Sequence, residues 1–182
     1  VTGVITWGGA IYFTGNTLLV DRCFFEENTS MSTTTESTKQ GYGGAIAVRH
    51  LHNLGGTGHT SLGATNAVIK NSTFYKNTGN TKGGAIYFNK QLDGVIDDDD
   101  ATFVVQNSVF VDNKSVHGGA TMQLGAAITL SSGANNANNK MQTIILTNNT
   151  ICNNNMTDAV GNPLQRNAVL LEGYRYTSYM AN

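Results

Sequence analysis

GGAIYF (residues 83–88) and NSVFVDN (residues 107–113) frame the stretch of sequence that decides the fold. Both halves recur along the 182-residue chain. Glycine pairs begin at residues 8, 43, 83 and 118, in steps of 35, 40 and 35, and Phe-x-x-Asn anchors or their Ile variant begin at residues 25, 74, 110 and 151, in steps of 49, 36 and 41. Fixed motifs with variable spacers indicate one structural unit per repeat, with insertions looping out of a constant core.

The residues before each anchor alternate with the period of a β-strand. Residues five and seven positions before the anchor are apolar, and residues four positions before it are polar. Val20, Ile69, Val105 and Leu146 stand at five before, Leu18, Ala67, Phe103 and Ile144 at seven before, and Asp21, Lys70, Gln106 and Thr147 at four before. β-Branched and aromatic residues are frequent here, which also favours strands.

Short strands repeated in this way predict an all-β fold, a right-handed single-stranded parallel β-helix. We expect four to five coils, each about 4.8 Å above the last, with long loop insertions. Equivalent side chains would then stack in columns, with asparagine amides bonded along theirs. The expected columns are Phe25, Phe74, Phe110 and Ile151, and Asn28, Asn77, Asn113 and Asn154.

One row of residues departs from simple alternation. Leu19, Val68, Val104 and Ile145 stand six positions before the anchor and are all apolar. In a regular strand this row faces away from the interior. Either an insertion loop covers the row, which is the interpretation we favour, or the row is an apolar stripe available to a partner.

The pairing of GGAI with Phe-x-x-Asn resembles the repeat of the polymorphic outer-membrane proteins, a family of bacterial surface adhesins and autotransporters. It is also similar to looser β-helix repeats of large secreted surface proteins. The resemblance implies a scaffold on the cell surface or outside the cell, and such scaffolds host many tasks. The fourth repeat departs from the pattern, because polar residues follow Gly118-Gly119-Ala120, and the segment that begins at Gly125 fits a strand better.

Composition bounds the remaining possibilities. Net charge is -1 and 13% of residues are charged, which argues against binding nucleic acid or anionic membranes. No apolar run approaches the ~20 residues that span a bilayer, so no membrane-spanning segment is expected. We expect residues 1–182 to form one domain, with an N-terminal strand or cap at 1–7, a fifth coil beginning near 167 on the pattern of Asn66–Ile69, and a C-terminal edge strand within 172–182.

The beginning of the chain and its cysteines carry two further expectations. The sequence lacks an initiator Met and a signal-like start, which is typical of a processed product or an excised fragment. Cys23 and Cys152 occupy different columns three repeats apart, so we expect both to be unpaired within the chain.

Two insertions contain side chains that could hold a metal. His50, His52 and His59 offer three nitrogens, the ligands that suit zinc or copper, but nearby glycines favour a loop of solvated histidines. Asp97, Asp98, Asp99 and Asp100 offer oxygen ligands for Ca²⁺, but they lack the spacing and glycine of a calcium loop. We therefore expect no cofactor and retain calcium as the alternative.

Catalysis is the less favoured interpretation. β-Helix enzymes that cleave acidic polysaccharides need clustered carboxylates with a basic residue on one sheet face, or a carboxylate pair. The outward columns mix charges instead, and we expect Lys76 to form an ion pair between Glu27 and Asp112 rather than a catalytic site.

The ends of the stack carry the functional hypothesis. A β-helix has two open ends, and no amphipathic helix or charged coil is evident that would cap them. Trp7, Tyr174, Tyr176 and Tyr179 are candidates for contact with a neighbouring copy. We expect a non-enzymatic extracellular structural protein, part of a surface filament or adhesin that assembles with itself through its ends and could contact a glycan or host surface. The alternative is a carbohydrate-binding or polysaccharide-lyase-like module that acts through one sheet face.

Overall fold

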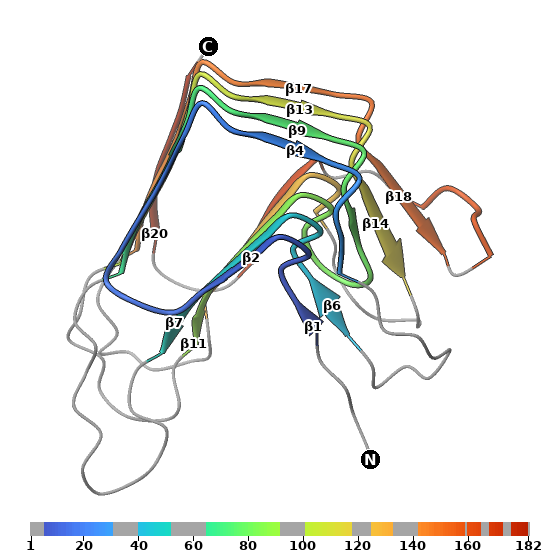
Figure 1. Cartoon of the computed structure of the whole chain (residues 1–182), viewed down its shortest axis with the longest axis horizontal. Helices are drawn as coiled ribbons and strands as arrows, with labels where there is room; N and C mark the ends of the chain where they lie inside the picture. Colours follow the sequence, from blue (N-terminus) through green and yellow to red (C-terminus); the bar gives the residue numbers. More distant parts are fainter. Residues whose placement is uncertain are drawn as a thin grey trace, which may run out of the picture.

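The structure is a computed structural model that describes residues 6–30, 40–51, 65–91, 101–117, 125–132, 142–158, 160–164, 168–172 and 176–181. These residues form β-strands and no helix, and every strand pairing is parallel (Figure 1). The prediction of an all-β fold built from stacked parallel strands is confirmed.

The strands form four large sheets and one small one. The first sheet contains β2 (Ile11–Phe13), β7 (Ile46–Leu51), β11 (Ile86–Gln91), β15 (Ile128–Ser132) and β19 (Val169–Glu172). The second contains β3 (Thr17–Asp21), β8 (Asn66–Lys70), β12 (Ala101–Gln106), β16 (Gln142–Thr147) and β20 (Tyr176–Ala181). The third contains β4 (Phe24–Glu26), β9 (Thr73–Tyr75), β13 (Val109–Val111) and β17 (Thr150–Cys152). The fourth contains β5 (Thr29–Ser30), β10 (Thr78–Gly79), β14 (Lys114–His117) and β18 (Asn155–Asp158), and β1 (Thr6–Trp7) pairs with β6 (Gly41–Tyr42).

Each coil gives one strand to each large sheet in turn. The first coil is β2 to β5, the second β7 to β10, the third β11 to β14 and the fourth β15 to β18, whereas β19 and β20 are the described strands of a fifth. In Figure 1 the coils lie one behind another, from blue at the front to orange. Residues that are far apart in sequence but occupy the same repeat position are therefore neighbours.

The Phe column sets the register of the third sheet; it comprises Phe25, Phe74, Phe110 and Ile151. Phe25 pairs with Phe74, Phe74 with Phe110 and Phe110 with Ile151. The rings of Phe25 and Phe74 are 4.9 Å apart at 5°, and those of Phe74 and Phe110 are 4.7 Å apart at 1°. This spacing is the distance between strands, so the rings stack face to face because the backbones stack.

The interior is apolar, and the alternation read from the sequence identifies its members. Inward residues of the second sheet such as Ala67, Ile69, Phe103 and Val105 are fully buried. They belong to one core cluster together with residues of the first and third sheets. The row at six before the anchor faces outward instead, and Leu19 is 61% exposed.

The chain turns between sheets at residues with positive φ. Arg22, Asn71, Asn107 and Asn148 lie between the second and third sheets, and Glu27, Lys76, Asp112 and Asn153 lie between the third and fourth, all with φ between 49° and 56°. Asparagine tolerates this left-handed conformation better than most residues. This conformation accounts for part of the asparagine content of the repeats.

The glycine pairs allow the backbone to approach itself closely before β2, β7 and β11 of the first sheet. Gly83 has a φ of +67°, and a Cβ there would lie 2.1 Å from the carbonyl oxygen of Ile86. A Cβ on Gly84 would lie 2.1 Å from the carbonyl oxygen of Ala126 in the next coil. The first glycine is needed for the turn, and the second for the contact between coils.

The structure resolves one register that the sequence left open and corrects another. Ile86 pairs with Ile128, so the fourth repeat opens at Gly125, the segment that fits a strand better, and not at Gly118, which lies outside the described residues. Val169 pairs with Ile128 in the first sheet, so residues 168–171 do not follow the pattern of Asn66–Ile69 in the second sheet. A fifth coil does begin there, and the C-terminal edge strand is β20, paired with β16.

Candidate functional site

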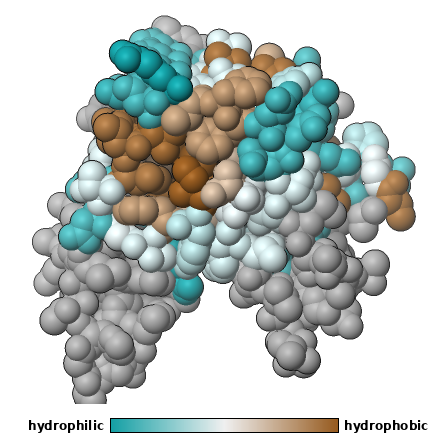
Figure 2. Space-filling view, in the orientation of Figure 1, coloured by the Kyte–Doolittle hydropathy of each residue, from teal (hydrophilic) through white to brown (hydrophobic). Residues whose placement is uncertain are grey.

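The first coil leaves the apolar interior open at one end of the stack. Ile11, Phe13 and Leu18 pack on the core but are only partly buried, whereas their register partners in the second coil are fully buried. Leu19 and Phe24, on the outer faces, are each 61% exposed. Figure 2 looks onto this end and shows an apolar patch over the first coil. We call the end surface formed by Ile11, Phe13 and Leu18 the first-coil face.

The opposite end of the stack is stepped. Among the described residues, β19 and β20 are the last strands of the first and second sheets, and β17 and β18, one coil earlier, are the last of the third and fourth. A cavity of about 320 Å³ lies at this step. Its lining residues come from the fourth and fifth coils: Leu146, Asn149, Ile151, Val169, Met180 and Ala181. We call this surface the stepped face.

An aromatic cluster holds the small sheet against the first sheet. The Trp7 ring lies 4.7 Å from Tyr42, 5.6 Å from Tyr12 and 5.8 Å from Tyr87, and the Arg49 guanidinium lies 5.1 Å from the Trp7 ring. Tyr42 and Tyr87 are buried, whereas Tyr12 is 46% exposed. The cluster therefore anchors β1 and presents one tyrosine to solvent.

The Asn column runs along the turn between the third and fourth sheets; it comprises Asn28, Asn77, Asn113 and Asn154. The Nδ2 of Asn28 donates to Oδ1 of Asn77, that of Asn77 to Asn113 and that of Asn113 to Asn154, each at 2.9 Å. Each receiving Oδ1 also accepts the backbone N–H of the preceding asparagine, at 2.9–3.0 Å. Asn77 and Asn113 are fully buried, so every amide group needs these partners.

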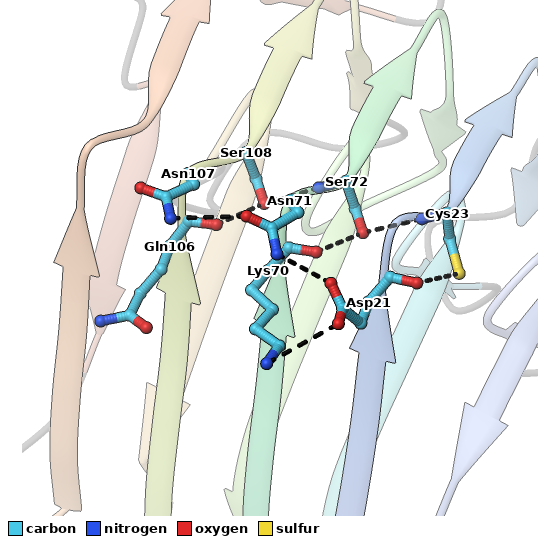
Figure 3. A network of polar contacts seen from close by, with 8 residues as sticks. All are labelled: Asp21, Cys23, Lys70, Asn71, Ser72, Gln106, Asn107 and Ser108. Carbon is cyan, nitrogen blue, oxygen red and sulfur yellow. Dashed lines mark hydrogen bonds and ion pairs between the residues drawn. The ribbon is translucent and has the colours of Figure 1, made fainter.

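A second ladder, which we did not predict from the sequence, joins the coils at the turn between the second and third sheets (Figure 3). We call it the corner column; it comprises Cys23, Ser72, Ser108 and Asn149. The backbone N–H of Cys23 donates to Oγ of Ser72, that of Ser72 to Oγ of Ser108, and that of Ser108 to Oδ1 of Asn149. The signal in the sequence was a small polar residue two positions before each anchor.

Outside the corner column lies an exposed polar row. Asn71 donates from Nδ2 to Asp21 at 2.8 Å, and the Lys70 ammonium lies 3.7 Å from the same carboxylate (Figure 3). The hydrogen bond from Asn71, with the charge of Lys70, lowers the pKa of Asp21 below its ordinary value. These contacts are exposed to solvent. They belong to the outward columns, whose mixed charges differ from the clustered carboxylates of a catalytic site.

The predicted metal ligands lie in insertions that the structure largely leaves undescribed. His50 lies in β7, and His52, His59 and Asp97 to Asp100 lie outside the described residues. Within the described part of the chain, no group of three His, Cys, Asp or Glu side chains could hold an ion. The zinc, copper and calcium hypotheses therefore stay predictions.

The Lys76 side chain lies over an aromatic ring, and the two cysteines are free. The Lys76 ammonium lies 4.7 Å from the centre of the Tyr75 ring, and no close ion pair with Glu27 or Asp112 appears among the described contacts. A hydrogen bond that the Lys76 ammonium donates to the Tyr75 side chain raises the pKa of Lys76, and the charges of Glu27 and Asp112 raise it further. Lys76 has a left-handed φ, and its side chain lies over the ring of the preceding residue, Tyr75. Cys23 and Cys152 are free and exposed, as predicted.

The aromatic residues predicted for assembly are placed at the two ends of the stack. Trp7 lies in the aromatic cluster beside the first coil, and Tyr176 and Tyr179 lie in β20 at the other end. Tyr174 is outside the described residues. Tyr179 pairs with Ile145 in the register of the second sheet.

One part of the chain matches a known family. Residues 71–89 match the Chlamydia polymorphic membrane protein repeat. The matched segment includes Phe74, Asn77, Gly83, Gly84 and Ile86, which form the columns and the turn described above. The resemblance inferred from the sequence is thus confirmed for this repeat. No curated protein and no solved structure matches the chain. Among the described residues, no helix has the length and apolar character needed to cross a bilayer.

Proposed function

We propose that the chain is a non-enzymatic structural segment of a cell-surface protein, a filament or adhesin whose stack is extended through its ends. Its body is a right-handed parallel β-helix, located outside the cell, and its partner is another copy or another protein of the same repeat type. The match of residues 71–89 to the Chlamydia polymorphic membrane protein repeat supports a surface location.

The single observation that carries this proposal is that, among the described residues, no strand covers the core at either end of the stack. The first-coil face presents partly buried core residues, Ile11, Phe13 and Leu18, and the stepped face contains a cavity next to Ile151. Within the described part of the chain, β4 and β17 are the outermost strands of the third sheet, so each has a backbone edge on which a further strand could pair. Burial of apolar side chains and parallel pairing of strands would thus both stabilise the contact with a partner.

Electron microscopy with size-exclusion chromatography over rising protein concentration tests the proposal. We expect polymers whose length increases with concentration and that persist at 1 M salt, because contacts through apolar surface and backbone hydrogen bonds are weakly screened, at about 3 Å Debye length. Monodisperse monomers at the highest concentration would overturn assembly through the ends.

Carbohydrate binding is a second candidate, favoured by the exposed tyrosine of the aromatic cluster. Tyr12 is 46% exposed, and its ring stacks on Trp7 at an interplanar angle of 29°. Aromatic faces beside a polar group such as Arg49 suit the apolar face of a sugar. A glycan whose binding is lost in Tyr12→Ala and retained in Tyr75→Ala would support this candidate. Chelator-sensitive cleavage of uronic-acid polymers would instead support a lyase.

A further inference from the structure

Five sequences of the form Asn-x-Ser/Thr, the acceptor motif for N-linked glycans, occur along the chain. They begin at Asn28, Asn71, Asn113, Asn148 and Asn155. A glycan is bulky and hydrated, so an asparagine can carry one in the folded chain only where its side chain reaches solvent. The exposed members are Asn71, Asn148 and Asn155, whereas Asn113 is fully buried and Asn28 is half-buried. The fold therefore divides the five motifs into two classes.

The hydrogen bonds of the side-chain nitrogen separate these classes independently of exposure. A glycan replaces one of the two hydrogens on Nδ2, so an asparagine that uses both hydrogens must lose a bond to accept a sugar. Nδ2 of Asn113 donates to the carbonyl oxygen of Phe74 and to Oδ1 of Asn154, each at 2.9 Å. A sugar on Asn113 would break one of these buried bonds and push neighbouring coils apart. The Asn column thus closes this motif to modification.

The exposed asparagines can keep their bonds when a sugar is attached. Among the described contacts, Nδ2 of Asn71 donates one bond, to Asp21 at 2.8 Å. Nδ2 of Asn155 likewise donates one, to the carbonyl oxygen of Asn153 at 3.0 Å. A glycosylated Nδ2 retains one hydrogen, so each bond can persist beside the glycan. Asn148 is held through its backbone N–H, which donates to β20 at 2.8 Å, and its side chain is exposed.

Two of the exposed asparagines belong to one row at the turn between the second and third sheets. Asn71, Asn107 and Asn148 occupy this turn in the second, third and fourth coils, with φ of 51°, 49° and 53°. Figure 3 shows Asn71 and Asn107 side by side next to the corner column. Glycans on Asn71 and Asn148 would lie two coils apart, about 10 Å, and project from the side of the stack.

We propose that Asn71, Asn148 and Asn155 are N-glycosylation sites and that the Asn column keeps Asn113 unmodified in the folded protein. In the transfer, Nδ2 forms a bond to the anomeric carbon of a sugar carried on a lipid pyrophosphate, Nδ2 loses a proton, and the lipid pyrophosphate leaves. The inference rests on the location outside the cell in the proposed function, because N-linked glycans are carried by exported proteins.

The test uses the whole chain, directed by a secretion signal into the medium of cultured animal cells, with its strands verified by circular dichroism. An amidase that releases N-linked glycans in heavy-oxygen water converts each glycosylated asparagine to a labelled aspartate. Peptide mass spectrometry then locates the label. We expect label at Asn71, Asn148 and Asn155 and none at Asn113.

Substitutions two residues after an asparagine provide matched controls. Thr73→Ala should remove only the glycan on Asn71, because it keeps the asparagine and destroys its motif. Asn107 has the same place in the row, but Val109 stands where the motif needs Ser or Thr. Val109 pairs with Thr73 and with Thr150 in the third sheet, so a threonine fits this position. Val109→Thr should therefore add one glycan, on Asn107.

Three results would overturn the proposal. The first is the absence of label from Asn71 and Asn148 in the folded, secreted chain. The second is label at Asn113 in a chain whose strands are intact. The third is a Val109→Thr variant that gains no glycan although it is folded and secreted.

Failure of this inference and failure of the proposed function are distinguishable. Unlabelled chains that form polymers would refute the glycan sites and leave assembly through the ends intact. Labelled chains that stay monomeric at every concentration, with and without their glycans, would support the sites and refute assembly by the chain itself.

Discussion

At the scale of the residue, close approach of backbones decides which positions tolerate change. Gly84 and the carbonyl oxygen of Ala126 leave no room for a side chain, because a Cβ would lie 2.1 Å from that oxygen. The sequence shows one glycine pair in most repeats. It does not show which glycine of a pair is needed for the turn and which for the contact between coils, because the two are adjacent.

Gly84→Ala should lower the free energy of unfolding by about 3 kcal/mol, since the two coils must separate to admit the methyl group. Urea unfolding monitored by circular dichroism measures this change. Gly15→Ala is the matched control, because the nearest atom to its added Cβ is in the Phe13 ring, at 3.0 Å, and a side chain can move. Equal stability of the two variants would contradict the described contact between coils.

Asp158 provides a residue-scale test of pH dependence. Its carboxylate accepts hydrogen bonds from Nδ2 of Asn162 at 2.8 Å and from the backbone N–H groups of Asn162 and Val160. The side-chain bond from Asn162, followed by the backbone bonds, lowers the pKa of Asp158 in the folded state. In the unfolded chain this pKa is about 3.9.

Because the folded-state pKa is the lower one, the stabilising effect of Asp158 is present above about pH 4 and is lost as pH falls through the folded-state value. The melting temperature should therefore fall less steeply between pH 4 and pH 2 in Asp158→Asn than in the wild type. Asp112→Asn serves as a control for a general loss of charge. Parallel melting curves for Asp158→Asn and the wild type would show that this turn does not couple to unfolding.

At the scale of the element, each strand is held by side-chain columns as well as by its ladder of backbone bonds. Asn77 uses its amide fully, since Oδ1 accepts from the backbone N and Nδ2 of Asn28, while Nδ2 donates to the Phe25 carbonyl and to Asn113. Removing this side chain would leave several buried polar groups in neighbouring coils without partners.

Asn77→Ala should accordingly destabilise the fold by about 3 kcal/mol, at the upper end of the cost of an unsatisfied buried group. Asn155→Ala provides the control, because the Asn155 side chain is exposed and donates to the carbonyl of the nearby Asn153, so its effect should stay within about 0.5 kcal/mol. Differential scanning calorimetry of both variants gives the comparison. A smaller loss for Asn77→Ala than for Asn155→Ala would contradict the role of the Asn column.

The register of the fourth repeat, which the sequence left open, and the sheet that contains residues 168–171 show what pattern matching at this scale cannot resolve. Gly118-Gly119-Ala120 repeats the letters of the other glycine pairs, whereas the strand in register begins after Gly125 with Ala126 in place of the second glycine. The decisive feature is the inward apolar side chain of Ile128, which pairs with Ile86. Likewise, Ala-Val occurs at 67–68 in β8 of the second sheet and again at 168–169, where β19 of the first sheet begins. These two letters therefore do not identify the sheet.

At the scale of the whole molecule, periodicity predicted the stacked parallel strands because every coil repeats the same inward positions. The ends were harder to predict, since they depend on which sheets contain a further strand. Trp7, for example, reads as an exposed apolar residue in sequence but packs among Tyr12, Tyr42 and Tyr87.

Sedimentation velocity over a range of protein concentrations tests assembly through the open ends most directly, using Leu18→Asp and Leu19→Asp. Leu18 points toward the core at the first-coil face, whereas its neighbour Leu19 lies on the outer face of the same strand. We predict that the wild type and Leu19→Asp form concentration-dependent polymers and that Leu18→Asp, checked by circular dichroism to retain its strands, sediments as a monomer. Undiminished polymers in folded Leu18→Asp, or loss of polymers in Leu19→Asp alone, would contradict the account.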